Sequence, residues 1–187
     1  MTAEKSSPEC IVDAKNLNKL VSHIAEEIIA REKRIEEVAL VGIYTAGVPL
    51  AERIAGVIKR KSGVKPPVGT IDIALYRDDV GLDGGLPAPV VGPTELDFNI
   101  PDYTIYLIDD VLFTGRTVRS AIDGIIYLGR PKAIRLAVLI DRGHRELPIQ
   151  ADIVGETVKT SKKQNIEVEL KELNEGKNRE EGVYLYK

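Results

Sequence analysis

The segment Thr104-Ile-Tyr-Leu-Ile-Asp-Asp-Val-Leu-Phe-Thr-Gly-Arg-Thr-Val-Arg119 predicts a strand, two acids, a loop and a helix, in that order. Residues 104–108 are apolar or β-branched, which is typical of a buried strand. Asp109 and Asp110 end that strand, and the helical spacing of apolar residues begins at Val118. The helix stops before a glycine and a proline, which commonly follow a helix end.

This order of elements predicts a site for a phosphate beside a sugar. Ligands of open α/β sheets lie beyond the carboxyl ends of the strands, and the start of a helix attracts phosphate through its amides and dipole. Gly115 lets the backbone approach the ligand, and Thr114 and Thr117 add hydroxyl donors. Asp109 and Asp110 suit sugar hydroxyls or a water-bound Mg²⁺. The predicted ligand is a ribose 5-phosphate; the alternative is a buried strand–helix unit with incidental polar residues.

Composition indicates an ordinary globular protein of one domain. The chain has 187 residues, of which 43% are hydrophobic and 29% charged, and its net charge is −3. It is long enough to bury a core and is not strongly basic, as many nucleic-acid-binding proteins are. Its single cysteine excludes a disulfide within the chain. No apolar run reaches the ~18 residues of a membrane helix, and no signal-peptide pattern is present. We therefore expect a cytoplasmic protein without a membrane partner.

A second strand–loop–helix unit precedes the central one. Residues 38–44 predict a buried strand, and a helical pattern follows Pro49, a residue that suits the first turn of a helix. The loop between them, Thr45, Ala46 and Gly47, is expected on the same rim of the sheet as the first loop. Two loops on one rim suit a ligand with phosphate at both ends, although an ordinary turn explains this loop equally well.

The whole pattern predicts an α/β fold with a central parallel sheet flanked by helices and a small cap from the terminal segments. Residues 1–10 are expected to be a disordered tail, followed by a helix that Asp13 or Asn16 caps. His23 in this helix is expected to be a surface histidine rather than a catalytic one, and the apolar residues that share one face of the helix are Leu17, Leu20, Val21, Ile24 and Ile28. Further strands are expected at residues 70–75 and 134–140, with short edge strands at residues 151–154, 166–170 and 183–186.

Residues 78–100 predict a long flexible loop, because they are rich in glycine, proline and acids. Loops of this length in a compact domain are commonly functional lids. A lid here excludes water from a reactive sugar cation, and Arg77 at its root is placed to reach a pyrophosphate. A disordered insertion is the alternative.

The central segment resembles the phosphoribosyl pyrophosphate (PRPP) motif of type I phosphoribosyltransferases, and the matching residues are Asp109, Asp110, Thr114, Gly115, Arg116 and Thr117. Further segments, among them residues 71–79 and 136–149, are similar to the PyrR family of pyrimidine operon regulators that are also uracil phosphoribosyltransferases. The resemblance runs from about residue 17 to the C-terminus.

This resemblance implies a type I phosphoribosyltransferase-like fold and the transfer of phosphoribose from PRPP to uracil with Mg²⁺, giving uridine monophosphate (UMP) and pyrophosphate. It also implies UMP-dependent binding of pyrimidine operon messenger RNA, which attenuates transcription, and a homodimer or homotetramer. The catalytic residues that it implies are Asp109, Asp110 and Arg77. The ligand-binding residues that it implies are Val111, Leu112, Phe113, Thr114, Gly115, Arg116 and Thr117 for the phosphate, Thr45, Ala46 and Gly47 for the pyrophosphate, and Ile140 and Arg142 beside the uracil.

The pyrophosphate loop departs from the family pattern. Relatives read Thr-Arg-Gly where this chain has Thr45, Ala46 and Gly47, and Tyr44 occupies a position that is often basic. A cation facing the pyrophosphate stabilises the leaving group. We therefore expect a slow or absent transferase that still binds nucleotide.

The expected RNA face also departs from the family. Glu26, Gln150 and Glu156 stand where relatives carry histidine, arginine and lysine. RNA affinity depends on neutralising phosphates, so RNA binding and attenuation are expected to be weak. The residues of this face that remain are Ser22, Arg145, Lys159, Lys162 and Lys163.

Two other functions stay open at this point. A non-catalytic nucleotide sensor that does not bind RNA fits an intact phosphate loop beside a weakened pyrophosphate loop. A purine or orotate transferase shares the fold, but the run Asp-Arg-Gly-His-Arg-Glu-Leu-Pro at residues 141–148 disfavours it.

Overall fold

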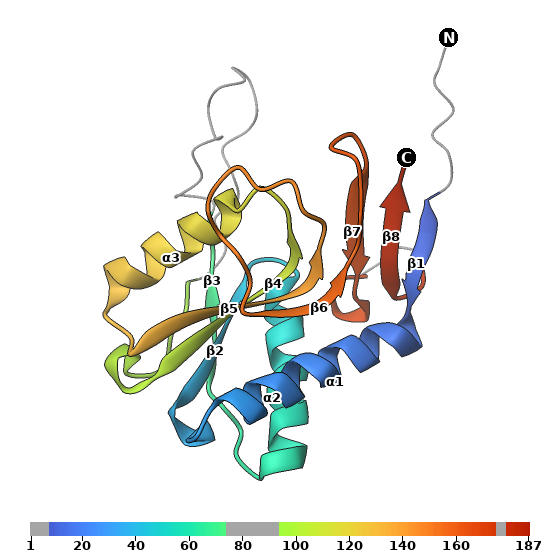
Figure 1. The fold of residues 1–187 in the computed structure, drawn as a ribbon. Helices are drawn as coiled ribbons and strands as arrows, with labels where there is room; N and C mark the ends of the chain where they lie inside the picture. The colour runs from blue at the N-terminus through green and yellow to red at the C-terminus, as the bar shows by residue number, and fades with distance from the viewer. Residues whose placement is uncertain (1–7, 74–93, 175–178) are drawn as a thin grey trace.

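The computed structural model describes residues 8–73, 94–174 and 179–187 (Figure 1). Its centre is a five-stranded sheet in which every neighbouring pair is parallel and the order is β3-β2-β4-β5-β6. The strands are β2 (Val38–Ile43), β3 (Val68–Ile71), β4 (Thr104–Leu112), β5 (Ala133–Asp141) and β6 (Ile153–Thr157). Because β4 is the middle strand, its carboxyl end lies at the centre of the rim where ligands of such sheets bind.

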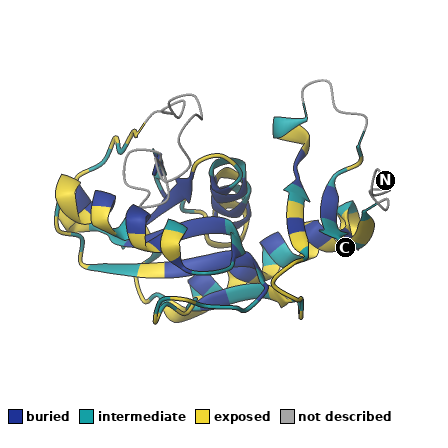
Figure 2. Cartoon of the chain, turned by 90° about the horizontal axis from the view of Figure 1, so that it is seen from above, coloured by how far each residue is buried: buried dark blue, intermediate teal, exposed yellow. Residues whose placement is uncertain are grey.

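Helices cover both faces of this sheet. The helices α1 (Ala14–Arg31) and α2 (Gly47–Ser62) lie on one face, and α3 (Arg116–Leu128) lies on the other (Figure 1). A hydrophobic core lies on each face of the sheet, because successive side chains of β2 point to opposite faces. Leu40 packs with α1 and α2 in one core, whereas Val41 packs with α3 in the other. Figure 2 shows the buried residues concentrated on the strands and on the helix surfaces that face them. The predicted α/β class is confirmed.

The first helix begins and packs as the sequence predicts. The Asp13 carboxylate accepts a hydrogen bond from the Asn16 amide at 2.8 Å, so Asp13 is the cap and Asn16 is not. Four of the five predicted apolar residues are fully buried, and Leu20 is partly buried. His23 is exposed, as expected for a surface histidine.

The terminal segments form a separate antiparallel sheet in the order β1-β8-β7. Its strands are β1 (Glu9–Asp13), β7 (Asn165–Glu169) and β8 (Gly182–Tyr186). This is the expected cap, in which the last strand of the chain, β8, lies between β1 and β7 (Figure 1). Two predictions are corrected: Glu9 and Cys10 belong to β1 and not to a disordered tail, and β8 is the middle strand of its sheet, whereas β6 and β7 are edge strands as predicted. Pairing with β8 orders β1, and this long-range contact leaves no local signal.

The third strand and the end of the predicted lid also differ from expectation. Strand β3 covers Val68–Ile71, two residues earlier than predicted at its start. Glu95 pairs with Thr70 through two backbone hydrogen bonds of 2.8 and 3.0 Å. Leu96 and Phe98 pack against the core on the α3 side. Residues 94–100 are therefore fixed to the sheet edge, whereas Arg77 and the remainder of the predicted lid lie outside the described residues.

Among the residues that the structure describes, no helix is both long enough and apolar enough to cross a membrane.

Candidate functional site

The two acids lie inside β4 and not after its end. Pairing with β5 continues past them, since Val111 is opposite Ile140 and Leu112 is opposite Asp141. The prediction that the strand stops at residue 108 is therefore wrong, because the partner strand supplies hydrogen bonds that the sequence of β4 does not reveal. Asp109 is buried, with 5% of its surface exposed, and Asp110 is half-buried.

Burial raises the pKa of both carboxyl groups. For Asp109 burial is the larger cause, the adjacent Asp110 adds like-charge repulsion, and the pKa is well above its ordinary range. Burial also raises the pKa of Asp110. Backbone amides oppose these effects: the Asp110 amide donates to Asp109 Oδ1 at 3.0 Å, and the Val111 amide donates to Asp110 Oδ1 at 2.9 Å. Ionising both groups in this protected place therefore costs stability.

A pocket of about 390 Å³ opens between β4 and the start of α3. Asp109 lines it and Asp110 does not. The other predicted residues that line it are Val111, Leu112, Phe113, Thr114, Gly115, Arg116 and Thr117. The sequence-predicted phosphate loop and one of the two acids are thus brought together in a single cavity at a helix start, the arrangement that favours an anion.

Gly115 is needed at the turn into α3. Its φ of +93° lies in the left-handed region. A Cβ atom there would lie 3.3 Å from Ile149 Cβ. Any side chain would therefore combine backbone strain with crowding at the mouth of the helix, so the glycine fixes the shape of the loop.

The second loop approaches β4 through glycines. A Cβ on Gly47 would lie 2.3 Å from the Ile108 carbonyl oxygen, one residue before Asp109, so α2 begins in direct contact with β4. Thr45 is exposed and Ala46 is half-buried, and neither lines the 390 Å³ pocket. Tyr44, whose peptide bond to Thr45 is cis, is 44% exposed. The loop reaches the predicted rim, but its side chains bring no positive charge there.

The residues predicted beside the uracil have other contacts. Ile140 is fully buried in the core. The buried Arg142 guanidinium donates to Thr160 Oγ1 at 3.2 Å and to the carbonyl oxygens of Ser161 and Gln164 at 3.0 and 2.5 Å. It also lies 4.2 Å from the centre of the Phe113 ring. Arg142 thus anchors the turn after β6, and its side chain is engaged within the protein.

Three residues that line the pocket were not predicted from the sequence as site residues, namely Val118, Ser120 and Glu146. Glu146 forms an ion pair with Arg116, Nε to Oε2, at 2.9 Å, and Ser120 donates to the Arg116 carbonyl oxygen at 3.1 Å. Glu146 reaches the pocket because Gly143 and His144 both have positive φ and turn the chain back toward α3. The only sequence signal was the glycine in the run at residues 141–148.

Comparison with known proteins supplies the family. The model of the phosphoribosyl transferase domain matches residues 9–173. A Bifunctional protein PyrR of Thermoanaerobacter sp. (strain X514) is 54% identical over 164 residues, which cover 88% of this chain and 91% of the relative. The chain belongs to the PyrR family. Another relative, the Bifunctional protein PyrR of Roseiflexus sp. (strain RS-1), is 49% identical over 175 residues. These residues make up 94% of this chain and 93% of the relative.

Solved structures agree with this PyrR assignment at the level of the fold. A hypoxanthine-guanine phosphoribosyltransferase of Bacillus anthracis superposes with a TM-score of 0.70 at 17% identity, over 96% of this chain and 98% of that one. An HGPRT-ase of Leishmania tarentolae in complex with GMP superposes with a TM-score of 0.71 at 12% identity, over 98% of this chain and 97% of that one. The type I phosphoribosyltransferase fold expected for a PyrR protein is confirmed.

Proposed function

We propose that this PyrR-family chain transfers ribose 5-phosphate from PRPP to uracil and releases pyrophosphate. The observation that carries the proposal is the pocket in which Asp109 lies beside the loop of Thr114, Gly115 and Thr117 at the start of α3. An anion-binding helix start next to a carboxylate fits a phosphate and the hydroxyl groups of its ribose. Family membership supports uracil as the acceptor.

The residues divide the work of this reaction. The loop at residues 114–117 binds the 5-phosphate, and the Asp109 carboxylate accepts hydrogen bonds from the ribose hydroxyls. The bond from C1 to the pyrophosphate oxygen breaks and its electron pair leaves with pyrophosphate, while the uracil nitrogen forms the new bond to C1 and loses its proton. The negative charge of Asp109 and Asp110 stabilises the positive charge that develops on the sugar.

The acids fit a magnesium ion that arrives with the substrate. No group of three or more histidine, cysteine, aspartate or glutamate side chains in the described parts of the chain forms a metal cage. Mg²⁺ commonly binds through one or two carboxylates, waters and substrate phosphates, and Asp109 and Asp110 supply such carboxylates. When bound, Mg²⁺ neutralises charge on the pyrophosphate.

Selection of uracil is assigned to the end of β5 and its backbone. Ile140 and Arg142 have side chains engaged elsewhere, so peptide groups rather than side chains read the edges of the base there. Phe113 lines the pocket and presents a ring between the phosphate loop and Arg142, which suits contact with a planar base.

Titration calorimetry tests this assignment. We expect UMP and PRPP to bind the wild-type chain and guanosine monophosphate (GMP) to bind at least tenfold more weakly. A site that prefers GMP would contradict the uracil assignment and favour a purine transferase on the same fold.

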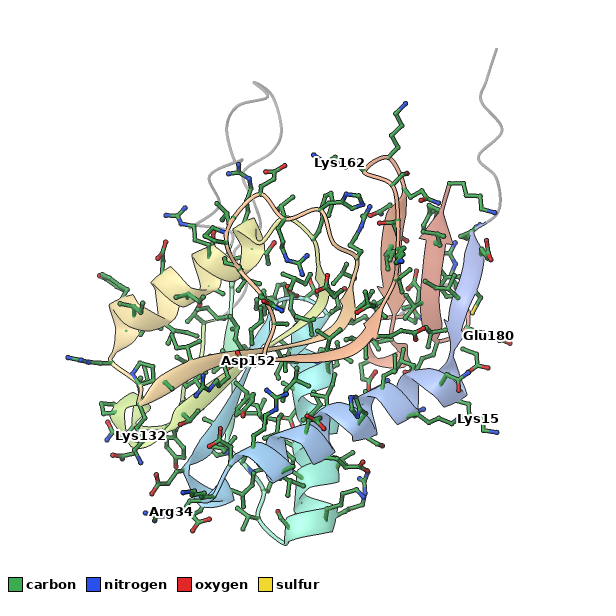
Figure 3. All side chains as sticks on the ribbon, in the orientation of Figure 1. Lys15, Arg34, Lys132, Asp152, Lys162 and Glu180 are labelled. Atoms are coloured by element: carbon green, nitrogen blue, oxygen red, sulfur yellow. The ribbon has the colours of Figure 1, made fainter. Side chains whose placement is uncertain are left out.

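The regulatory activity of the family requires a surface that binds RNA. In this structure, fewer positively charged side chains are free on that surface than the sequence indicates. Arg145, expected on this surface, has its guanidinium engaged within the protein. Glu26 pairs with Lys61 at 3.0 Å, and Gln150 and Glu156 are exposed without positive charge. Exposed Lys159, Lys162 and Lys163 remain, and Lys162 projects from the turn between β6 and β7 (Figure 3).

We therefore expect weak binding of pyrimidine leader RNA. Few phosphates are neutralised on this face, so the affinity should be low and should fall little with added salt. A gel-shift assay at low salt, with and without UMP, measures this. Tight RNA binding that depends on UMP would contradict the expectation and support attenuation.

A nucleotide sensor without transferase activity is the second candidate, and the uncharged Ala46 loop favours it. Both candidates retain UMP binding at the phosphate loop. For either candidate function, we propose from family membership that the chain forms a homodimer or homotetramer and is cytoplasmic.

A further inference from the structure

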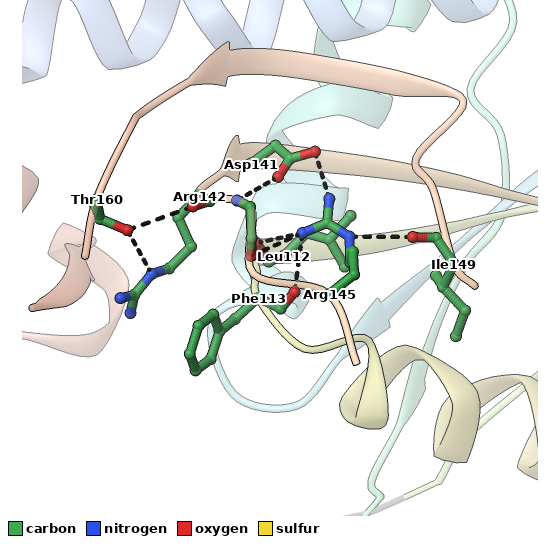
Figure 4. A network of polar contacts seen from close by, with 8 residues as sticks. Leu112, Phe113, Asp141, Arg142, Arg145, Ile149 and Thr160 are labelled. Atoms are coloured by element: carbon green, nitrogen blue, oxygen red, sulfur yellow. Dashed lines mark hydrogen bonds and ion pairs between the residues drawn. The ribbon is translucent and has the colours of Figure 1, made fainter. Parts of the chain in front are cut away.

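Residues 141–150, which begin at the last residue of β5, fold back over the phosphate loop; we name them the clamp segment. It turns at Gly143 and His144, which have φ angles of +76° and +62°. The Asp141 carboxylate accepts from the Gly143 amide at 2.9 Å and closes the turn. This brings Arg145 alongside the end of β4 (Figure 4).

Arg145 links four parts of the chain through one guanidinium (Figure 4). Its Nη1 donates to the carbonyl oxygens of Phe113 at 2.9 Å, Gly143 at 3.1 Å and Leu112 at 3.4 Å. Its Nε donates to the Ile149 carbonyl oxygen at 3.0 Å, and its Nη2 pairs with Asp141 Oδ2 at 2.5 Å. Only 22% of the side chain is exposed. Arg145 is therefore committed to backbone acceptors of the phosphate loop and of the clamp segment.

The clamp segment holds the next peptide group as well. The Thr114 carbonyl oxygen accepts from the amides of Glu146 at 3.0 Å and Leu147 at 3.2 Å. Three consecutive carbonyl oxygens, those of Leu112, Phe113 and Thr114, thus point toward the clamp segment. In a trans peptide the N–H group points opposite to the C=O group, so the amides of the following residues, Phe113, Thr114 and Gly115, point away from it.

We propose that Arg145 is a positioning residue for phosphate binding. It fixes the carbonyl oxygens of Leu112 and Phe113 and so orients the amides that follow them for the ligand's 5-phosphate. Successive amides held in one direction make an anion-binding concavity, and their orientation before the ligand arrives lowers the cost of binding. The proposal rests on the proposed phosphate site and gives Arg145 a role other than RNA contact.

The test compares UMP with uridine, which has the same base and sugar but lacks the phosphate. Calorimetry measures both dissociation constants for the wild type, Arg145→Gln and Arg145→Lys. Glutamine cannot bridge both carbonyl oxygens, so we expect UMP affinity to fall about 10- to 100-fold, as for other small misplacements of binding groups, with uridine affinity changed less than about threefold. Lysine keeps one charged donor and should recover part of the loss.

Arg53→Gln is the matched control. Arg53 is also partly buried, with 13% of its side chain exposed, and it holds Glu172 through two hydrogen bonds of 2.8 and 2.5 Å. These bonds join α2 to the short helix Lys171–Leu173 and touch no residue of the pocket. Arg53→Gln should lower the melting temperature and leave the UMP-to-uridine preference unchanged.

The outcomes separate the proposals. A folded Arg145→Gln chain with the wild-type UMP-to-uridine preference would overturn the positioning role and leave the phosphate site intact. A wild-type chain that binds uridine as tightly as UMP would overturn the phosphate site itself and the positioning role with it. If Arg145→Gln does not fold, Arg145→Lys provides the test. We expect its preference for UMP over uridine to be about threefold or more below that of the wild type. An unchanged preference would refute the positioning role.

Discussion

Replacing Asp109 by asparagine is expected to lower kcat/KM for uridine monophosphate synthesis about 10²–10³-fold, the usual effect of removing one group that stabilises charge in a transition state. The same change should raise the melting temperature at neutral pH. Asp109 is 5% exposed, and burial with the adjacent Asp110 raises its pKa. A neutral amide of the same shape removes that unfavourable charge but offers no charge to the developing sugar cation.

The pH dependence follows from the direction of this pKa shift. Between the ordinary aspartate pKa of about 3.9 and the raised folded value, the folded state binds more protons than the unfolded state. The free energy of unfolding of the wild type therefore falls as pH rises through that window. The stability advantage of Asp109→Asn should be absent near pH 4 and full above the raised pKa. Transferase activity should change in the opposite sense and be lost as pH falls through the raised pKa.

Thermal unfolding from pH 4 to pH 8 and steady-state kinetics check both expectations. For a chain of this size, each 1 kcal/mol corresponds to about 2–4 °C in melting temperature. Asp123→Asn is the control, because Asp123 is an exposed residue of α3 that pairs with Arg119 at 2.9 Å. It should change neither property measurably. A fully active Asp109→Asn chain would show that Asp109 does not act on the sugar.

Arginine at position 46 is expected to raise the transferase rate by about 10- to 100-fold. Ala46 immediately precedes Gly47, which contacts the Ile108 carbonyl oxygen beside the acids, so the loop reaches the correct rim without a cation. A charged donor there would stabilise the departing pyrophosphate, and such donors are commonly worth 10²–10³ in rate. Ala46 is half-buried, and we expect the arginine stem to pack there with its head in solvent.

A uracil-dependent assay of pyrophosphate release compares the wild type, Ala46→Arg and Ala46→Gln. Glutamine has a long polar side chain without charge and should give little of the gain. A wild-type rate equal to that of Ala46→Arg would show that the chain needs no cation at this position. That result would remove the reason to consider a non-catalytic sensor.

Sequence periodicity predicted the elements whose partners are nearby. The helical spacing from Leu17 to Ile28 and the apolar run of β2 each follow from a repeat that one face of a sheet or helix imposes, and Asp13 caps α1 through a contact three residues away. The phosphate loop was predictable because a glycine is a local requirement of this strand-to-helix turn, where Gly115 has a φ of +93°.

Contacts between distant residues decided what the sequence could not predict. Strand β4 continues past Asp110 because β5 pairs with it. Arg142 finds its acceptors 18 to 22 residues away, and Arg145 reaches Phe113 and Leu112, 32 and 33 residues away. Glu146 enters the pocket only because the chain reverses at His144. The single-domain organisation, the catalytic role of Arg77 and the binding roles of the site residues stay predictions.

A crystal structure of the chain with UMP tests the central claim most directly. We predict that the phosphate lies within hydrogen-bond distance of the amides of residues 114–117, with the ribose hydroxyls toward Asp109. A UMP phosphate bound elsewhere while this loop is empty, or an Asp109 side chain turned away from the ribose, would contradict the account.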